Sequence, residues 1–263
     1  MAEEARGTAL ITGASAGIGE AFARRLAGRG HALVLVARRK DRLDELANEL
    51  SGAHDVAVEV IDADLATEEG VAAVEARLRA GDIELLVNNA GFGTVGDFAS
   101  LPLDRELQEL DVNVRALMRL THVALGPMTE RRRGGIINVA STAAFQPIPH
   151  NATYAATKAF VLHFSEAVHE EAKAHNISVT CLCPGPVRTE FQEVAGIDRS
   201  NLPAIAWTSV DTVVDAALSA LRAGRAITVP GPMNVAAATT TRMMPRFLVR
   251  RIAGAMFRDA GNQ

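Results

Sequence analysis

Short apolar runs alternate with longer segments in which apolar residues recur every three or four positions. The apolar runs occupy 8–12, 31–37, 55–61, 84–90, 135–141, 177–183 and 226–230. Most of them are apolar at almost every position, which is typical of strands in a sheet that is covered on both faces. The segments 17–30, 40–52, 67–81, 103–130 and 152–175 have the length of helices, and an amphipathic stripe predicts another helix over 210–221.

This alternation predicts right-handed parallel crossovers and a doubly wound α/β fold, with a seven-stranded, mostly parallel sheet between helices on both faces. The chain has 263 residues and contains no Pro/Gly/Ser-rich linker, low-complexity tract or short repeat. We therefore expect one domain over residues 1–263.

Composition excludes several classes of function. The net charge of −4 provides no basic field that would attract nucleic acid. Cys181 and Cys183 are the only cysteines; we expect them to be buried on one face of a strand, and we predict no disulfide and no metal site. The acidic N-terminal segment does not resemble a secretory signal, and no apolar run approaches roughly 18 residues. We expect a cytoplasmic protein.

The first predicted strand leads directly into the sequence TGASAGIG. Its glycines, Gly13, Gly17 and Gly19, lie in a turn that opens a helix. A dinucleotide pyrophosphate binds at such a turn, because backbone N–H groups and the helix N-terminus face it and no Cβ blocks its approach. The turn predicts a Rossmann-type nucleotide-binding fold.

The end of the second strand indicates which dinucleotide is bound. An NAD-binding unit usually has an acidic residue there that bonds the ribose 2′-OH. This chain has Ala37 at that place, followed by Arg38 and Arg39. Two guanidinium groups favour a 2′-phosphate, so we predict NADP(H).

Tyr154 is the only tyrosine of the chain, and Lys158 follows it by one helical turn. A phenol can act as a general acid toward a carbonyl oxygen, and a neighbouring ammonium lowers the pKa of that phenol. Ser141 ends the fifth strand, where its hydroxyl can bond the same oxygen. Asn113 lies on the long helix. We expect Ser141, Tyr154 and Lys158 to meet at one catalytic site.

Seven segments occur together in one order: TGASAGIG, DADL (62–65), NNAG (88–91), Asn113, Ser141, YAATK (154–158) and PGPVRT (184–189). With them the chain resembles the short-chain dehydrogenase/reductase (SDR) family over nearly its whole length. The resemblance implies that Lys158 also bonds the nicotinamide ribose, that Asn113 holds a water in a proton relay, and that the protein is a homodimer or homotetramer. Together with the glycine turn and the arginines, it assigns the cofactor to Gly13, Ser15, Gly17, Ile18, Gly19, Arg38, Arg39, Asp64, Leu65, Asn88, Ala90, Gly91, Tyr154, Lys158, Pro184, Gly185, Val187 and Thr189.

The segment 189–209 contains Trp207, the only tryptophan, and is long enough to form a lid over the substrate. The candidate pocket residues are mostly apolar: Phe92, Phe145, Ile148, His150 and Pro186. They favour a small hydrophobic ketone, aldehyde or alcohol as the substrate. His150 either touches that substrate or is a solvated loop residue.

The C-terminal tail, 240–263, contains five arginines up to residue 258 and an apolar helical face. It predicts a basic amphipathic helix over 240–258. Such a helix either packs on the sheet edge, a partner subunit or the lid, or contacts a membrane surface peripherally.

The sequence thus predicts an NADP(H)-dependent oxidoreductase that interconverts a hydrophobic ketone or aldehyde and an alcohol. Reduction of a 3-oxoacyl thioester, on an acyl carrier protein or coenzyme A, is the alternative within the same class. An NADP(H)-sensing binding protein on the same fold is the alternative from another class.

Overall fold

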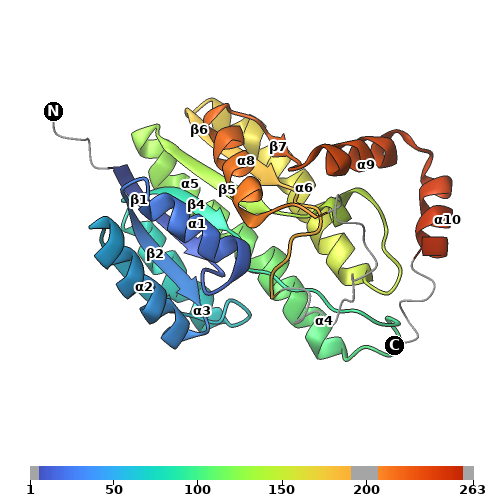
Figure 1. The fold of residues 1–263 in the computed structure, drawn as a ribbon, viewed down its shortest axis with the longest axis horizontal. Coiled ribbons are helices and arrows are strands. Elements are labelled where there is room, and N and C mark those ends of the chain that lie inside the picture. Colours follow the sequence, from blue (N-terminus) through green and yellow to red (C-terminus); the bar gives the residue numbers. More distant parts are fainter. Residues whose placement is uncertain (1–5, 191–206, 257–263) are drawn as a thin grey trace.

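A seven-stranded sheet runs through the part of the chain that the computed structural model describes, residues 6–190 and 207–256. Its order is β3-β2-β1-β4-β5-β6-β7, and every neighbouring pair is parallel (Figure 1). The strands are β1 (Arg6–Thr12), β2 (His31–Ala37), β3 (Val58–Asp62), β4 (Ile83–Asn88), β5 (Gly134–Val139), β6 (Ile177–Leu182) and β7 (Ile227–Thr228).

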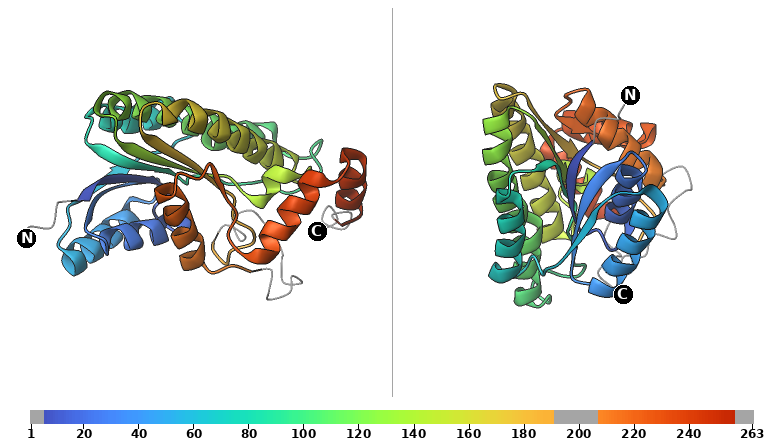
Figure 2. Two further views of the ribbon diagram at one scale, coloured as in Figure 1. Left: turned by 90° about the horizontal axis from the view of Figure 1, so that it is seen from above. Right: turned by 90° about the vertical axis from the view of Figure 1, so that its left-hand side faces the viewer.

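Helices cover both faces of this sheet (Figure 2). One layer holds α1 (Gly17–Ala27), α2 (Lys40–His54) and α8 (Val210–Arg222), and the other holds α3 (Glu68–Arg79), α5 (Leu117–Arg131) and α6 (Ala152–Lys173). Each layer has its own apolar core against the sheet, the first around Phe22 and the second around Leu120 and Met128. The predicted doubly wound fold is confirmed. Its strands are almost wholly apolar because they are covered on both sides.

The segment predicted as one helix over 103–130 consists of three pieces. α4 (Leu103–Leu110) runs into a π-helical turn (Asp111–Ala116), which continues as α5. Asn113 lies in this turn, and its amide is held by the backbone of Phe92 and the hydroxyl of Thr157. Single π turns inside α-helices are frequent at functional sites.

The tail predicted as one helix over 240–258 forms two helices in the described residues, which end at 256. The structure has α9 (Pro232–Met243) and α10 (Arg246–Met256), separated at Met244 and Pro245. Proline lacks a backbone N–H and restricts the residue before it, so the helix ends there. Phe247 and Ile252 on α10 are exposed. Among the described residues, no helix has the length and hydropathy to cross a bilayer.

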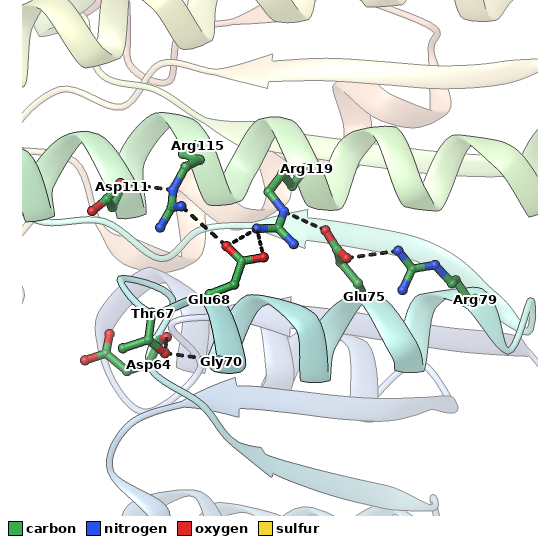
Figure 3. A network of polar contacts seen from close by, with 9 residues as sticks. All are labelled: Asp64, Thr67, Glu68, Gly70, Glu75, Arg79, Asp111, Arg115 and Arg119. Atoms are coloured by element: carbon green, nitrogen blue, oxygen red, sulfur yellow. Dashed lines mark hydrogen bonds and ion pairs between the residues drawn. The ribbon is translucent and has the colours of Figure 1, made fainter.

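An ion-pair network joins α3 to α5 (Figure 3). Arg119 on α5 lies 2.6 Å from Glu68 and 2.7 Å from the largely buried Glu75. The guanidinium of Arg119 holds the pKa of Glu75 below its usual value. Thr67 caps α3 by accepting a hydrogen bond from the N–H of Gly70 at 3.0 Å. The network thereby fixes the start of α3 and the loop after β3 that precedes it.

A second polar network lies inside the protein, between the sheet and α5 and α6. The amide of Asn88 on β4 donates to Asn138 at 2.9 Å and to Thr121 at 3.0 Å. Asn138 on β5 in turn donates to Ser165 on α6 at 3.0 Å. All four side chains are buried. These bonds satisfy polar groups that would otherwise lose their hydration in the core.

We expect Asn138→Ala to destabilise the fold. The change leaves the amide of Asn88 and the hydroxyl of Ser165 with fewer partners, and an unsatisfied buried group costs about 2 kcal/mol. Urea unfolding measures the loss. The matched control is Asn48→Ala on the exposed face of α2, which should change the free energy of unfolding by less than about 0.5 kcal/mol. Equal effects of the two substitutions would contradict a role for the network.

Candidate active site

A cavity of about 510 Å³ opens at the carboxyl ends of the central strands. Ligands bind at this edge of doubly wound sheets, where the strand order reverses. Here the reversal lies between β1 and β4. The cavity is lined by Gly13, Ser15, Ala16, Gly17, Ile18, Val36, Ala37, Arg38, Arg39, Ala63, Asp64, Leu65, Ala66, Asn89, Ala90, Gly91, Phe92, Arg105, Gln108, Val112, Val139, Ala140, Ser141, Tyr154, Lys158, Pro184, Gly185, Pro186, Val187, Thr189 and Glu190.

The glycine turn forms the floor at one end of this cavity. Gly13 has a φ of 66°, in the left-handed region that glycine adopts without strain. A Cβ on Gly19 would lie 2.2 Å from the carbonyl oxygen of Gly13, so only glycine fits between the turn and α1. The amide of Asn89, after β4, donates to the carbonyl of Thr12 at 2.9 Å and ties the turn to the neighbouring strand. Sequence reasoning did not single out Asn89.

The two predicted arginines stand at the same end. Arg39 lies 3.1 Å from the hydroxyl of Ser15 and 2.8 Å from the carboxylate of Glu190. Arg38 is more exposed, with its guanidinium 4.0 Å from Asp64. Arg42, one turn into α2, also pairs with Glu190, at 2.5 Å. These arginines lie beside Ala37 at the end of β2. A carboxylate at position 37 would repel a 2′-phosphate, and alanine does not.

Ser141, Tyr154 and Lys158 line the cavity together, as predicted from the sequence. The hydroxyl of Ser141 accepts a hydrogen bond from the N–H of Ala143 at 3.1 Å, which caps the short 3₁₀ turn Thr142–Phe145. Tyr154 and Lys158 lie on the first turns of α6, and both are buried. The ammonium of Lys158 donates to the carbonyl of Val139 at 3.0 Å and lies 5.6 Å from the centre of the Tyr154 ring.

Burial changes the electrostatics of Lys158. Loss of hydration lowers the pKa of its ammonium to about 8, while the nearby carboxyl of Glu109 acts in the opposite direction. A lysine with this pKa exchanges its proton near neutral pH, which an exposed lysine does not. The site therefore holds a titratable cation next to a buried phenol.

Three of the predicted site residues lie behind the cavity wall instead of lining it. Asn113 is fully buried and bonded to Phe92 and Thr157. Asn88 belongs to the internal network with Asn138, so its side chain does not face the cofactor cleft. Gly19 packs under the glycine turn. The roles that the resemblance implies for these residues remain predictions.

The pocket candidates divide in a similar way. Phe92 and Pro186 line the cavity, whereas Phe145, Ile148 and His150 do not. The ring of His150 is partly buried and lies 2.8 Å from the carboxylate of Asp97. Its two sequence-based interpretations, a substrate contact and a solvated loop residue, stay predictions.

Residues of α4 and of the π-helical turn after it complete the cavity wall. The guanidinium of Arg105 stacks 4.0 Å above the ring of Phe92. Gln108 and Val112 line the cavity beyond it. No sequence motif indicates these three, because they reach the site only through the positions of α4 and of the π-helical turn that holds Val112. The predicted lid, 189–209, lies mostly outside the described residues. Of its aromatic residues, Trp207 is described, 5.1 Å from the guanidinium of Arg188.

The two cysteines have the predicted environment. Cys181 and Cys183 are free and fully buried, and their Sγ atoms are 3.7 Å apart. They lie in the third apolar cluster, beside α6.

A dinucleotide-type glycine turn at one end of a cleft and a Ser–Tyr–Lys group at the other define a nucleotide-dependent oxidoreductase on a doubly wound fold. The model of the short chain dehydrogenase family matches residues 7–199. The chain belongs to this family.

Known relatives agree with this assignment. The very-long-chain 3-oxoacyl-CoA reductase of Bos taurus is 31% identical over 93% of this chain and 78% of its own length. Alignments to reductases of that name cover 62 to 78% of their length. A short-chain dehydrogenase from Sphingobium yanoikuyae in complex with NADPH is 40% identical, with a TM-score of 0.83 and 95% of each chain covered. A bulky-bulky ketone specific alcohol dehydrogenase from Comamonas testosteroni is 35% identical, with a TM-score of 0.80 over 96% of this chain and 94% of its own.

We expect Lys158→Met to stabilise the fold at pH 7. The lysine pKa is lower in the folded protein, about 8, than in the unfolded chain, about 10.4. Burying the charge therefore costs stability below pH 8, and this cost disappears as the pH rises from 8 toward 10.4. Removing the charge should raise the free energy of unfolding at pH 7 by on the order of 2 kcal/mol, and the gain should shrink at pH 10.

Chemical unfolding at the two pH values measures this gain. Lys173→Met provides the matched control, because Lys173 lies exposed at the end of the same helix and pairs with Glu170 at 2.7 Å. Its effect should stay within about 0.5 kcal/mol at both pH values. A Lys158→Met protein that is less stable than the wild type at pH 7 would show that the buried ammonium does not strain the fold.

Proposed function

We propose that the protein is an NADP(H)-dependent reductase of hydrophobic ketones or aldehydes. One observation carries the proposal: Ser141, Tyr154 and Lys158 meet at the end of a cleft whose other end holds the glycine turn and Arg39. The described residues thus offer places for a dinucleotide and for a carbonyl group next to it.

Each residue at this end of the cleft has a separate role in carbonyl reduction. Bound NADPH supplies a hydride to the carbonyl carbon. Tyr154 gives its phenolic proton to the carbonyl oxygen, on which negative charge develops. The Ser141 hydroxyl bonds that oxygen and stabilises the charge. The Lys158 ammonium favours the phenolate of Tyr154 and so makes the phenol a stronger acid. Phe92 and Pro186 line the cavity and offer apolar surface to the substrate.

Cofactor choice follows from the cationic end of the cleft. Arg39 and Ser15 together offer a guanidinium and a hydroxyl to a 2′-phosphate, and Ala37 supplies no carboxylate for a ribose 2′-OH. The NADPH in the structure of the Sphingobium yanoikuyae relative supports this choice.

Two substrate classes have support. The Comamonas testosteroni relative acts on bulky-bulky ketones and is similar over 96% of this chain, which favours a bulky hydrophobic ketone. The similarity to very-long-chain 3-oxoacyl-CoA reductases favours a 3-oxoacyl thioester as the second candidate. A binding protein that only senses NADP(H) would not need the buried Lys158 beside Tyr154. A cytoplasmic homodimer or homotetramer, and membrane contact through α10, remain predictions.

Tyr154→Phe should lower kcat for carbonyl reduction by about 10²- to 10⁴-fold, because the variant keeps the ring but has no proton to donate. NADPH oxidation is measured over a panel of bulky ketones and 3-oxoacyl thioesters, and NADPH binding is measured separately. NADPH binding should change far less than kcat, which separates a loss of chemistry from a loss of cofactor. Full activity of the variant would remove Tyr154 from the chemistry. If the wild type and the variant both bind NADPH but reduce no substrate of the panel, an NADP(H)-sensing binding protein becomes the favoured function.

Arg39→Gln should weaken NADP(H) binding by roughly tenfold and leave NAD(H) binding unchanged, because the lost guanidinium is the group proposed to bind the 2′-phosphate, which NAD(H) lacks. Calorimetric titration with both cofactors measures the two affinities. Lys40→Gln is the control, since this neighbouring cation pairs with Asp44 at 2.5 Å and does not line the cavity. If the wild type binds NAD(H) more tightly than NADP(H), the cofactor assignment is wrong.

A further inference from the structure

The carboxylate of Glu190 bridges two arginines at the cationic end of the cleft. Its Oε2 lies 2.8 Å from Nη1 of Arg39, and its Oε1 lies 2.5 Å from Nη1 of Arg42. Within the described part of the chain, Glu190 makes no other ion pair. Glu190 and Arg39 both line the cavity, whereas Arg42 does not. One acidic side chain therefore holds the arginine to which we assign the 2′-phosphate.

Every donor nitrogen of Arg39 has a partner. Its Nε and Nη2 donate to the hydroxyl of Ser15 at 3.2 and 3.1 Å, and Nη2 also donates to the carbonyl of Ser15 at 3.2 Å. Its Nη1 donates to Glu190. Of these partners only the carboxylate carries a charge, so it is the one that a phosphate oxygen resembles most closely. A phosphate that pairs with Arg39 therefore either replaces Glu190 or binds close beside it.

Charge makes the second arrangement unfavourable. Arg42 and Arg39 hold the pKa of Glu190 below its usual value, so its carboxylate is ionised at neutral pH. A phosphate monoester carries about −1.5 to −2 charges at pH 7. Two such anions close together repel each other, and each weakens the binding of the other. Replacement is the easier course, because Glu190 can leave Arg39 and keep its contact with Arg42.

The loop that carries Glu190 is held in place by other contacts. It follows β6, and the N–H of Thr208 donates to the carbonyl of Pro186 within it at 3.0 Å. Thr189 packs on the glycine turn, since a Cβ on Gly17 would lie 3.1 Å from its methyl carbon. The loop therefore does not depend on the carboxylate of Glu190, and loss of that charge should leave the rest of the cofactor cleft intact.

We propose that Glu190 is an internal competitor for the 2′-phosphate of NADP(H): its carboxylate holds Arg39 until the phosphate replaces it. Glu190 thus acts against Arg39 in setting cofactor selectivity, and it weakens the binding of NADP(H) but not that of NAD(H). The competition lowers the affinity for NADP⁺ as well as for NADPH, which favours release of the oxidised cofactor after turnover. The proposal rests on the NADP(H) site proposed above.

Glu190→Gln tests the competition, because glutamine keeps the shape of the side chain and removes its charge. We expect the Kd for NADP⁺ and NADPH to fall by about three- to tenfold, and the Kd for NAD⁺ and NADH to stay within about twofold. Calorimetric titration of the protein without substrate measures all four at one ionic strength. Adenosine 2′,5′-bisphosphate should show the same gain as NADP(H), and adenosine 5′-phosphate should show none.

Two further variants separate contact from general charge. Glu45→Gln makes the same change of charge on α2, where the exposed Glu45 acts on Arg42 only through space. It should change each Kd by less than about twofold. In an Arg39→Gln background, Glu190→Gln should tighten NADP(H) binding by less than about twofold, because the group for which the two anions compete is gone.

Three results would overturn the competition and leave the NADP(H) assignment standing. An unchanged affinity of Glu190→Gln for NADP(H) would mean that phosphate and carboxylate bind side by side. An equal gain for NAD(H) would mean a general effect of charge or of the loop. Weaker NADP(H) binding would make Glu190 a residue that positions Arg39 for the phosphate. If the wild type and Glu190→Gln both bind NAD(H) more tightly than NADP(H), the cofactor assignment fails and the competition fails with it.

Discussion

The burial of one ammonium group, that of Lys158, is the constraint on which this site depends. Its charge has little water around it, and it is held by the carbonyl of Val139 at the end of β5. Desolvation makes the charged form unstable, which brings its pKa into the range where proton exchange is fast. An exposed lysine at the same place would act more weakly on Tyr154, because water would screen its charge.

The rest of the fold supports this unfavourable group. Two apolar cores, one on each face of the sheet, stabilise the strands whose carboxyl ends carry the site. The internal network from Asn88 to Ser165 fixes β4 and β5 against α6, the helix that holds Tyr154 and Lys158. Arg119 joins α3 to α5 and so fixes the adjoining side of the cleft (Figure 3). Packing and polar bonds elsewhere in the fold thus offset the free energy lost by burying the charge of Lys158.

Much of this arrangement could be predicted from the sequence, since the strands are nearly continuous apolar runs and the motifs have fixed spacing. Features that depend on contacts between distant segments could not. The π turn at Asn113 needs Phe92 and Thr157, and the burial of Glu106 needs Thr94 and Thr153. On sequence alone, charged residues of α4 resemble a solvated helix face. Pro245 itself signals the end of a helix. The amphipathic pattern of the tail nevertheless suggested that the helix continues through it.

The central claim is that the buried ammonium tunes the phenol of Tyr154. Because Tyr154 is the only tyrosine, an ultraviolet titration of phenolate formation in the NADP⁺ complex reports this group alone. The account predicts a wild-type pKa clearly below the ordinary value of about 10, and a shift back to that value or above it in Lys158→Met. A phenol that titrates near about 10 in both proteins would contradict it.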